Sequence, residues 1–195
     1  MNKKIIVFIG SDGSGKSTLI KHVKNQLEKE NTPTDIFFMG WKDFYNPLVR
    51  MLSKFYLKRK DKSNEEKLKR YRPRSWIFYI VYYIELWTRY LKVLASKKKY
   101  VLLDRYFFDE LAFADGFKFK LFKLLTPKPD TCLLLKCSPE ILKKRGVVVS
   151  QENFDNFYKN LESIKNFFPL FVIDSSPSLQ KVYKKIENII FDKKT

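Results

Sequence analysis

The chain has 195 residues, of which 45% are apolar and 31% are charged. This balance is typical of a globular domain and excludes an intrinsically disordered chain, and the length is sufficient for one core that needs no disulfides. The formal net charge of +18 predicts affinity for anions such as nucleotides, nucleic acid or an acidic membrane surface. A general enrichment in lysine, without any specific site, explains the same charge equally well.

The N-terminal sequence MNKKIIVFIG holds an apolar run of five residues that leads directly into SDGSGK. Such a run is too short for a signal peptide or a membrane span. Cys132 and Cys137 lie five residues apart in a predicted strand, so they point to opposite faces and no disulfide between them is expected. Both observations predict a cytoplasmic protein.

Short, nearly continuous apolar runs predict five strands, each buried on both faces. They cover residues 4–10, 34–40, 99–104, 130–137 and 169–174. Helical spacing of apolar residues predicts helices at residues 17–30, 74–96, 139–145 and 178–190. Ser138 and Ser178 are expected to open the last two helices. Strands that alternate with helices predict a doubly wound α/β fold with a parallel sheet, in a single domain that spans residues 1–195.

The helix predicted at 74–96 is apolar nearly all round from Trp76 to Ile84. Glu85 then interrupts the apolar run, which is too short to span a bilayer. We expect a buried helix, with one face available to a second subunit in a homodimer, rather than a helix that lies on a membrane.

The sequence GSDGSGKS, residues 10–17, matches the phosphate-loop pattern G-x-x-x-x-G-K-[ST]. It stands between a predicted strand and a predicted helix, which is the context that the pattern requires. Its glycines permit backbone N–H groups to turn inward around an anion, and the helix N-terminus adds partial positive charge. We expect Lys16 to reach the β- and γ-phosphates of ATP, and Ser17 to supply a hydroxyl to Mg²⁺. The predicted ATP phosphate-binding residues are Gly10, Ser11, Asp12, Gly13, Ser14, Gly15, Lys16, Ser17 and Thr18.

Asp104 ends a predicted strand, where ligands bind in open α/β sheets. Its carboxylate is expected to hold Mg²⁺ or to steer the incoming acceptor, and a helix-capping aspartate is the alternative. The next residue, Arg105, is expected to neutralise charge on a phosphoryl group. Lys16, Asp104 and Arg105 are therefore predicted catalytic residues, with Ser17 and Asp104 as the metal ligands.

The sequence LKKRG, residues 142–146, lies at the end of the predicted helix at 139–145. Its basic residues could complement the helix C-terminus, with Gly146 as the residue that ends the helix. The favoured interpretation is a mobile lid, about residues 143–152, that lowers Arg145 onto the transferring phosphate as an arginine finger. Arg145 is the fourth predicted catalytic residue.

Together these motifs resemble the thymidylate kinase family of nucleoside monophosphate kinases, over most of the chain. GSDGSGKST resembles the family's phosphate loop, LLDRY its D-R-[YH] motif, CLLLKCSPEILKKR its fourth strand and lid entry, and FVIDSSPSLQKVYKKI its last strand and helix. The resemblance implies a five-stranded parallel sheet flanked by helices, and ATP- and Mg²⁺-dependent phosphoryl transfer to a nucleoside monophosphate or a similar small anionic acceptor. It also implies that Asp12 contacts the acceptor sugar and Arg105 its phosphate.

The acceptor-side region, about residues 41–98, departs from the family pattern. Trp41 and Lys42 stand where the family has an arginine–proline–glycine turn that holds the monophosphate. The aromatic that stacks on thymine falls near Tyr79, and the base-reading arginine falls near Tyr83. These four residues complete the predicted acceptor site, and their identities predict that thymidylate is a poor acceptor. Candidates to replace the missing arginine are Arg89, Arg72 and Arg74.

Two alternatives remain open. A kinase of the same fold could act on a deoxynucleoside or on a sugar- or lipid-linked hydroxyl, which the missing turn favours. A slow ATPase switch or a nucleic-acid-binding module is the alternative of another class. Basic and aromatic residues interleaved over residues 55–90 favour it, and the lack of a clear water-orienting glutamine disfavours it. The basic segment 58–74 is either a solvated connection or a collar for an anionic acceptor or a membrane surface.

Overall fold

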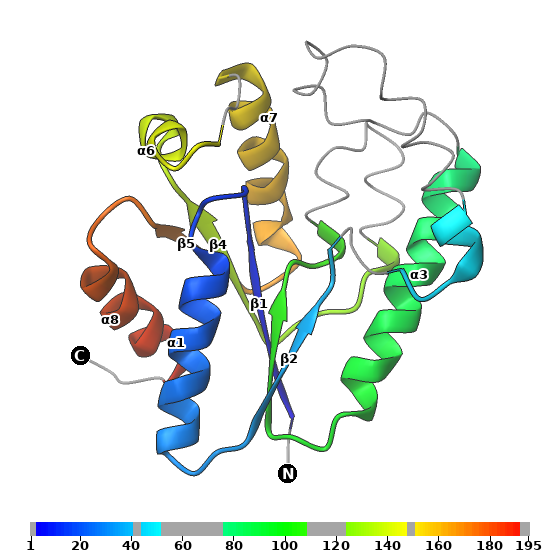
Figure 1. Cartoon of the computed structure of the whole chain (residues 1–195), viewed down its shortest axis with the longest axis horizontal. Coiled ribbons are helices and arrows are strands. Elements are labelled where there is room, and N and C mark those ends of the chain that lie inside the picture. The colour runs from blue at the N-terminus through cyan, green and yellow to red at the C-terminus, as the bar shows by residue number, and fades with distance from the viewer. Residues whose placement is uncertain (1–2, 41–43, 52–75, 109–123, 148–150, 192–195) are drawn as a thin grey trace. The chain divides into compact units, whose positions relative to one another are not determined.

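The computed structural model describes residues 3–40, 44–51, 76–108, 124–147 and 151–191 (Figure 1). These residues belong to two compact units, one made of residues 1–40 and 96–195 and the other of residues 41–95. The larger unit contains the sheet and the phosphate loop. The smaller unit contains the long helix α3 (Trp76–Ala95).

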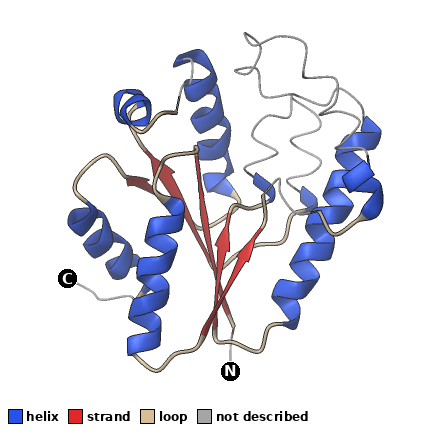
Figure 2. Cartoon of the chain, in the orientation of Figure 1, coloured by secondary structure: helices blue, strands red, loops and turns tan. Residues whose placement is uncertain are grey.

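The larger unit is built on five parallel strands in the order β2-β3-β1-β4-β5 (Figure 2). The prediction of a five-stranded parallel sheet is confirmed, and each strand ends within two residues of its predicted bounds. The strands are β1 (Lys4–Gly10), β2 (Thr34–Phe38), β3 (Tyr100–Asp104), β4 (Thr131–Lys136) and β5 (Leu170–Asp174).

The prediction that every strand is buried on both faces is right for the three central strands and wrong for the two at the edges. Strands β1, β3 and β4 are buried along nearly their whole length. By contrast, Ile36 and Phe38 of β2 are exposed, as are Phe171 and Val172 of β5. An edge strand has a neighbour on one side only, so its apolar side chains are less completely covered.

Two helices cover one face of this sheet. Helix α1 (Lys16–Lys29) begins where the phosphate loop ends, and α8 (Leu179–Ile190) lies beside it (Figure 1). His22 of α1 stacks on Tyr183 of α8, with ring centroids 3.6 Å apart. The core under the two helices consists of Ile6, Phe8, Leu19, Ile20, Val23, Leu27, Tyr100, Leu102, Leu133, Leu135, Ile173, Val182, Ile186 and Ile190.

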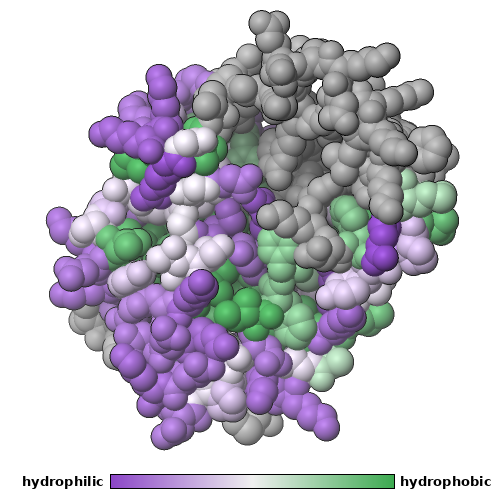
Figure 3. Space-filling model, viewed as in Figure 1, coloured by the Kyte–Doolittle hydropathy of each residue, from purple (hydrophilic) through white to green (hydrophobic). Residues whose placement is uncertain are grey.

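The outer surface of α1 and α8 is largely hydrophilic (Figure 3). Its exposed lysines include Lys21, Lys29, Lys181, Lys184 and Lys185. Part of the large positive charge of the chain is therefore spread over this surface as solvated side chains.

The segment after β4 forms helix α6 (Pro139–Lys144) and then helix α7 (Gln151–Glu162). A short 3-10 helix, η2 (Ser163–Asn166), follows α7. The predicted cap of α6 is confirmed, because Ser138 Oγ accepts the N–H of Ile141 at 3.4 Å. Helix α7 was missing from the sequence-based prediction. Its signal is the helical spacing of four buried residues, Phe154, Phe157, Tyr158 and Leu161.

In the smaller unit, α3 confirms the helix predicted at 74–96, but the helix is not buried all round. Tyr82, Leu86, Tyr90 and Val93 are buried, whereas Ile80, Ile84, Leu91 and Leu94 are each about half exposed. In the ranges that the structure describes, no helix is long and apolar enough to cross a membrane.

A buried ion pair joins Glu85 and Arg89 of α3, with Arg89 Nε 2.9 Å from Glu85 Oε1. Glu85 also accepts the backbone N–H groups of Tyr45 and Asn46 at 2.8 Å each. A buried charge is tolerated when it is paired and hydrogen-bonded in this way. The pair therefore ties α3 to residues 45–46 within the smaller unit.

Candidate active site

The loop between β1 and α1 has the backbone geometry that a phosphate cradle requires. Gly15, at φ 93°, is in the left-handed region that favours glycine, and it is the N-cap of α1. The N–H of Ser14 closes the loop by donating to Ser11 O at 3.2 Å. The N-terminus of α1, with its partial positive charge, thus faces any anion that the loop binds.

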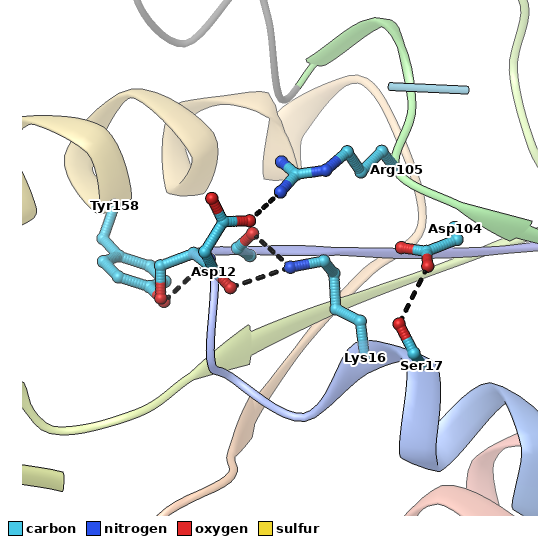
Figure 4. A network of polar contacts seen from close by, with 8 residues as sticks. Asp12, Lys16, Ser17, Asp104, Arg105 and Tyr158 are labelled. Atoms are coloured by element: carbon cyan, nitrogen blue, oxygen red, sulfur yellow. Dashed lines mark hydrogen bonds and ion pairs between the residues drawn. The ribbon is translucent and has the colours of Figure 1, made fainter. Parts of the chain in front are cut away.

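Lys16 places its ammonium on the carbonyls of the same loop. Its Nζ donates to Gly10 O at 2.9 Å and to Ser11 O at 2.7 Å (Figure 4). An ammonium has three protons to donate, and phosphate oxygens are stronger acceptors than neutral carbonyls. Lys16 is therefore positioned to exchange a backbone partner for a phosphate.

Ser17 and Asp104 contact each other at the carboxyl end of the sheet. Ser17 Oγ donates to Asp104 Oδ2 at 3.1 Å (Figure 4). Asp104 Oδ1 is buried and has no hydrogen-bond partner among the residues that the structure describes. A buried carboxylate oxygen without a partner is costly, and hard oxygen ligands are those that Mg²⁺ prefers. The two residues fit a Mg²⁺ ion, which favours the metal-binding interpretation over the helix cap.

Arg105 follows β3 with a φ of 71°, which is unusual for a residue with a side chain and typical of functional sites. Its backbone N–H donates to Phe8 O at 2.9 Å. Its buried guanidinium pairs with the carboxylate of Asp12, which is largely exposed (Figure 4). The fold thus brings together the two residues of the larger unit that the family resemblance assigned to the acceptor.

Arg145 ends α6, and its side chain also reaches the phosphate loop. The N–H of Gly146 donates to Lys143 O at 3.0 Å, as expected at a helix end. Arg145 Nη1 donates to Gly13 O at 2.6 Å. A Cβ on Gly13 would come within 2.9 Å of Val147 Cγ2, so Val147 packs against the loop where only a glycine fits. Residues 148–150 of the predicted lid lie outside the described residues.

Tyr158 of α7 also contacts the loop and was missed in the sequence. Its hydroxyl lies 3.0 Å from Ser11 Oγ (Figure 4). The hydroxyl also donates to Leu135 O at 2.9 Å. Burial raises the pKa of the Tyr158 phenol above its usual value, so the group is protonated at neutral pH. Helical spacing could have placed Tyr158 on a buried face, but no sequence signal indicates its contact with this loop.

The predicted acceptor residues of the smaller unit are only partly described. Trp41 and Lys42 lie outside the described residues, as does the segment 58–74 with Arg72 and Arg74. Tyr79 lies in α3 with its side chain outside the description, and Tyr83 is half-buried. Arg89 is only 4% exposed and is paired with Glu85, which argues against Arg89 as the replacement for the base-reading arginine.

Comparisons with known proteins agree with this geometry. The family model described as Thymidylate kinase matches residues 8–186. A thymidylate kinase of Desulfotalea psychrophila is 25% identical over 193 residues, which cover 95% of this chain and 90% of that protein. The solved thymidylate kinase of Candida albicans has a TM-score of 0.69 at 17% identity and covers 98% of this chain and 92% of its own. That of Ehrlichia chaffeensis has a TM-score of 0.61 at 17% identity and covers 97% and 100%.

The two solved structures show that the fold is shared. The family match shows more, because it extends over most of the chain and includes the phosphate loop from Gly10 to Ser17, Asp104, Arg105 and Arg145. The chain therefore belongs to the thymidylate kinase family, whose members are phosphotransferases that use ATP and Mg²⁺ to phosphorylate a nucleoside monophosphate.

Proposed function

We propose that phosphoryl transfer in this protein relies on the residues that meet around the phosphate loop. The observation that carries the proposal is a pair of contacts made by the loop, Ser17 with Asp104 and Asp12 with Arg105. The first pair suits a metal ion and the second suits an acceptor. Family membership favours a nucleoside monophosphate as the acceptor, and it favours neither an unphosphorylated acceptor nor a slow ATPase switch.

In this mechanism the loop and Lys16 bind the β- and γ-phosphates of ATP. Ser17 and Asp104 hold Mg²⁺, and the ion when bound supplies positive charge to the phosphates. Arg105 neutralises the acceptor phosphate while Asp12 orients the acceptor sugar. Arg145 covers the transferring group from the lid. None of these residues forms a bond to phosphorus, so catalysis consists of positioning and charge neutralisation.

We expect thymidylate to be a poor acceptor. Tyr83 offers a single hydroxyl donor where the family arginine offers a fork of N–H groups, and Arg89 is already paired with Glu85. Steady-state kinetics with ATP and a panel of nucleoside monophosphates measure this preference. A kcat/KM for thymidylate of roughly 10⁴ M⁻¹s⁻¹ or more, the ordinary enzyme range, would contradict the prediction.

The same panel carries its own controls. Unphosphorylated nucleosides in the panel test the alternative acceptor class, because they should give no labelled product from labelled ATP.

With the best acceptor, Tyr79→Ala should raise the KM for that acceptor and leave the KM for ATP unchanged, since stacking concerns the acceptor alone.

We also propose that two copies of the chain associate through the exposed face of α3. Ile80, Ile84, Trp87, Leu91 and Leu94 follow one another at spacings of four and three residues, so they form one apolar stripe. Trp87 lies in the middle of the stripe. An antiparallel copy related by a two-fold axis through Trp87 would therefore set Ile80 against Leu94, with Ile84 and Leu91 close to each other's copies.

Sedimentation measures this association. The wild type should be a dimer, and Leu91→Glu should be a monomer at the same concentration, because the substitution sets two charges inside the apolar contact. Lys97→Glu is the matched control, since it changes an exposed residue outside the stripe and should leave the dimer intact. A monomeric wild type would refute the proposal.

A reducing cytoplasm is the compartment that we propose. Cys132 and Cys137 are buried thiols that form no disulfide with each other. Peripheral contact with a membrane stays a hypothesis, because the basic segment 58–74 lies outside the described residues, and contact with nucleic acid is not expected.

A further inference from the structure

The described part of the segment 139–162 contacts the phosphate loop at two points, one on each side of Asp12. Arg145 contacts the carbonyl of Gly13, through an exposed side chain at the lid. Tyr158 contacts Ser11, through a ring that is 1% exposed. The exposed contact of Arg145 suits a side chain that moves, whereas the buried contact of Tyr158 suits a side chain that stays in place.

The ring of Tyr158 is held firmly by its neighbours. It packs against Phe154 and Phe157, with ring centroids 4.6 and 5.2 Å away. Its hydroxyl donates to Leu135 O in β4 at 2.9 Å, which ties the phenol to a central strand. Since the hydroxyl gives its single proton to Leu135 O, its oxygen remains as an acceptor for another donor.

Ser11 supplies the donors. Its Oγ lies 3.0 Å and its backbone N 3.4 Å from the Tyr158 hydroxyl. On its other side, Ser11 O accepts Lys16 Nζ at 2.7 Å and the N–H of Ser14 at 3.2 Å. The orientation of this one residue therefore affects both the position of Lys16 and the closure of the loop.

We propose that Tyr158 is a positioning residue that holds Ser11, and through Ser11 the phosphate loop and Lys16, in the conformation that binds ATP. The inference rests on the phosphate-binding function proposed for the loop. A loop that is ordered before ATP arrives loses less conformational entropy on binding. Loss of the Tyr158 hydroxyl should thus weaken the binding of ATP and not that of the acceptor.

The test is Tyr158→Phe, which keeps the ring and its packing. We expect the KM for ATP and its calorimetric dissociation constant to rise by about tenfold, as for one hydrogen bond lost, with the acceptor KM unchanged. Tyr106→Phe is the matched control, because the Tyr106 hydroxyl is also buried and donates to Pro127 O at 3.0 Å. Both variants should melt at a similarly lowered temperature, but only Tyr158→Phe should bind ATP more weakly.

Ser11→Ala supplies a second, independent variant. It should raise the dissociation constant for ATP by itself, and Tyr158→Phe should have a smaller effect in this background, because one of the two contacts is already lost. If the two substitutions instead raised the dissociation constant for ATP independently, so that their fold-changes multiply in the double variant, the Tyr158 hydroxyl would act through a residue other than Ser11. That result would overturn the inference. So would a Tyr158→Phe variant that binds ATP as the wild type does. A wild type that binds no ATP would instead refute the proposed function of the loop.

Discussion

Lys16→Ala is expected to lower the turnover number by about two to three orders of magnitude, as is usual for a group that stabilises charge in the transition state. The Lys16 ammonium donates to the carbonyls of Gly10 and Ser11, and Lys16 is not a member of the apolar core under α1 and α8. Its removal therefore leaves that core intact. Circular dichroism and thermal melting of the purified variant, together with kcat, measure the two effects separately.

Lys21→Ala is the matched control for this substitution. Lys21 lies in the same helix, is exposed and has no proposed role, so turnover should not change. A folded Lys16→Ala protein with near-normal turnover would remove the phosphate-binding role of the loop.

Asp104→Asn is the second substitution with a large expected effect. Turnover should fall by about two orders of magnitude or more, while the affinity for ATP falls far less, because the loop and not Asp104 holds the triphosphate. The amide keeps the shape of the side chain but removes its charge and one of its two oxygens. Since oxygen ligands and charge determine Mg²⁺ affinity, a higher Mg²⁺ concentration should restore part of the lost turnover.

Asp130→Asn is the control for the loss of a carboxylate. Asp130 precedes β4 at the other end of the sheet, where its Oδ2 accepts the N–H of Ile5 at 2.7 Å. This substitution should lower the melting temperature and leave the Mg²⁺ dependence of turnover as it is in the wild type. An Asp104→Asn protein with normal turnover and a lost affinity for ATP would assign Asp104 to a different role.

Sequence reasoning was most successful where one short stretch carries both structure and chemistry. Residues 10–17 specify a strand end, a turn and a helix start, and their polar atoms lie within a few residues of one another. The edge positions of β2 and β5 could not be obtained in the same way, because strand order depends on pairing between distant segments. The sequence predicted roles for Arg105 and Arg145. It did not predict that Arg105 contacts Asp12 or that Arg145 contacts Gly13.

Two features that the sequence analysis missed were within reach of the sequence. Glu85 and Arg89 are four residues apart on a helix, the spacing of an ion pair, so the pairing of Arg89 could have been expected. Helix α7 shows its apolar spacing clearly. The contact between Tyr158 and Ser11 was not predictable, since it joins residues separated by 147 positions and depends on how α7 packs.

The central position of β1 has a consequence for how the protein is made. Of the five strands this one is synthesised first, yet Lys4 pairs with Tyr100 and Ile6 with Thr131. Its apolar residues must therefore wait, unpaired, until most of the chain has been synthesised. Non-local pairing of this kind folds slowly and leaves an unfinished chain prone to aggregation. The arrangement that puts the phosphate loop at the middle of the sheet thus lengthens the time for which the nascent chain exposes apolar residues.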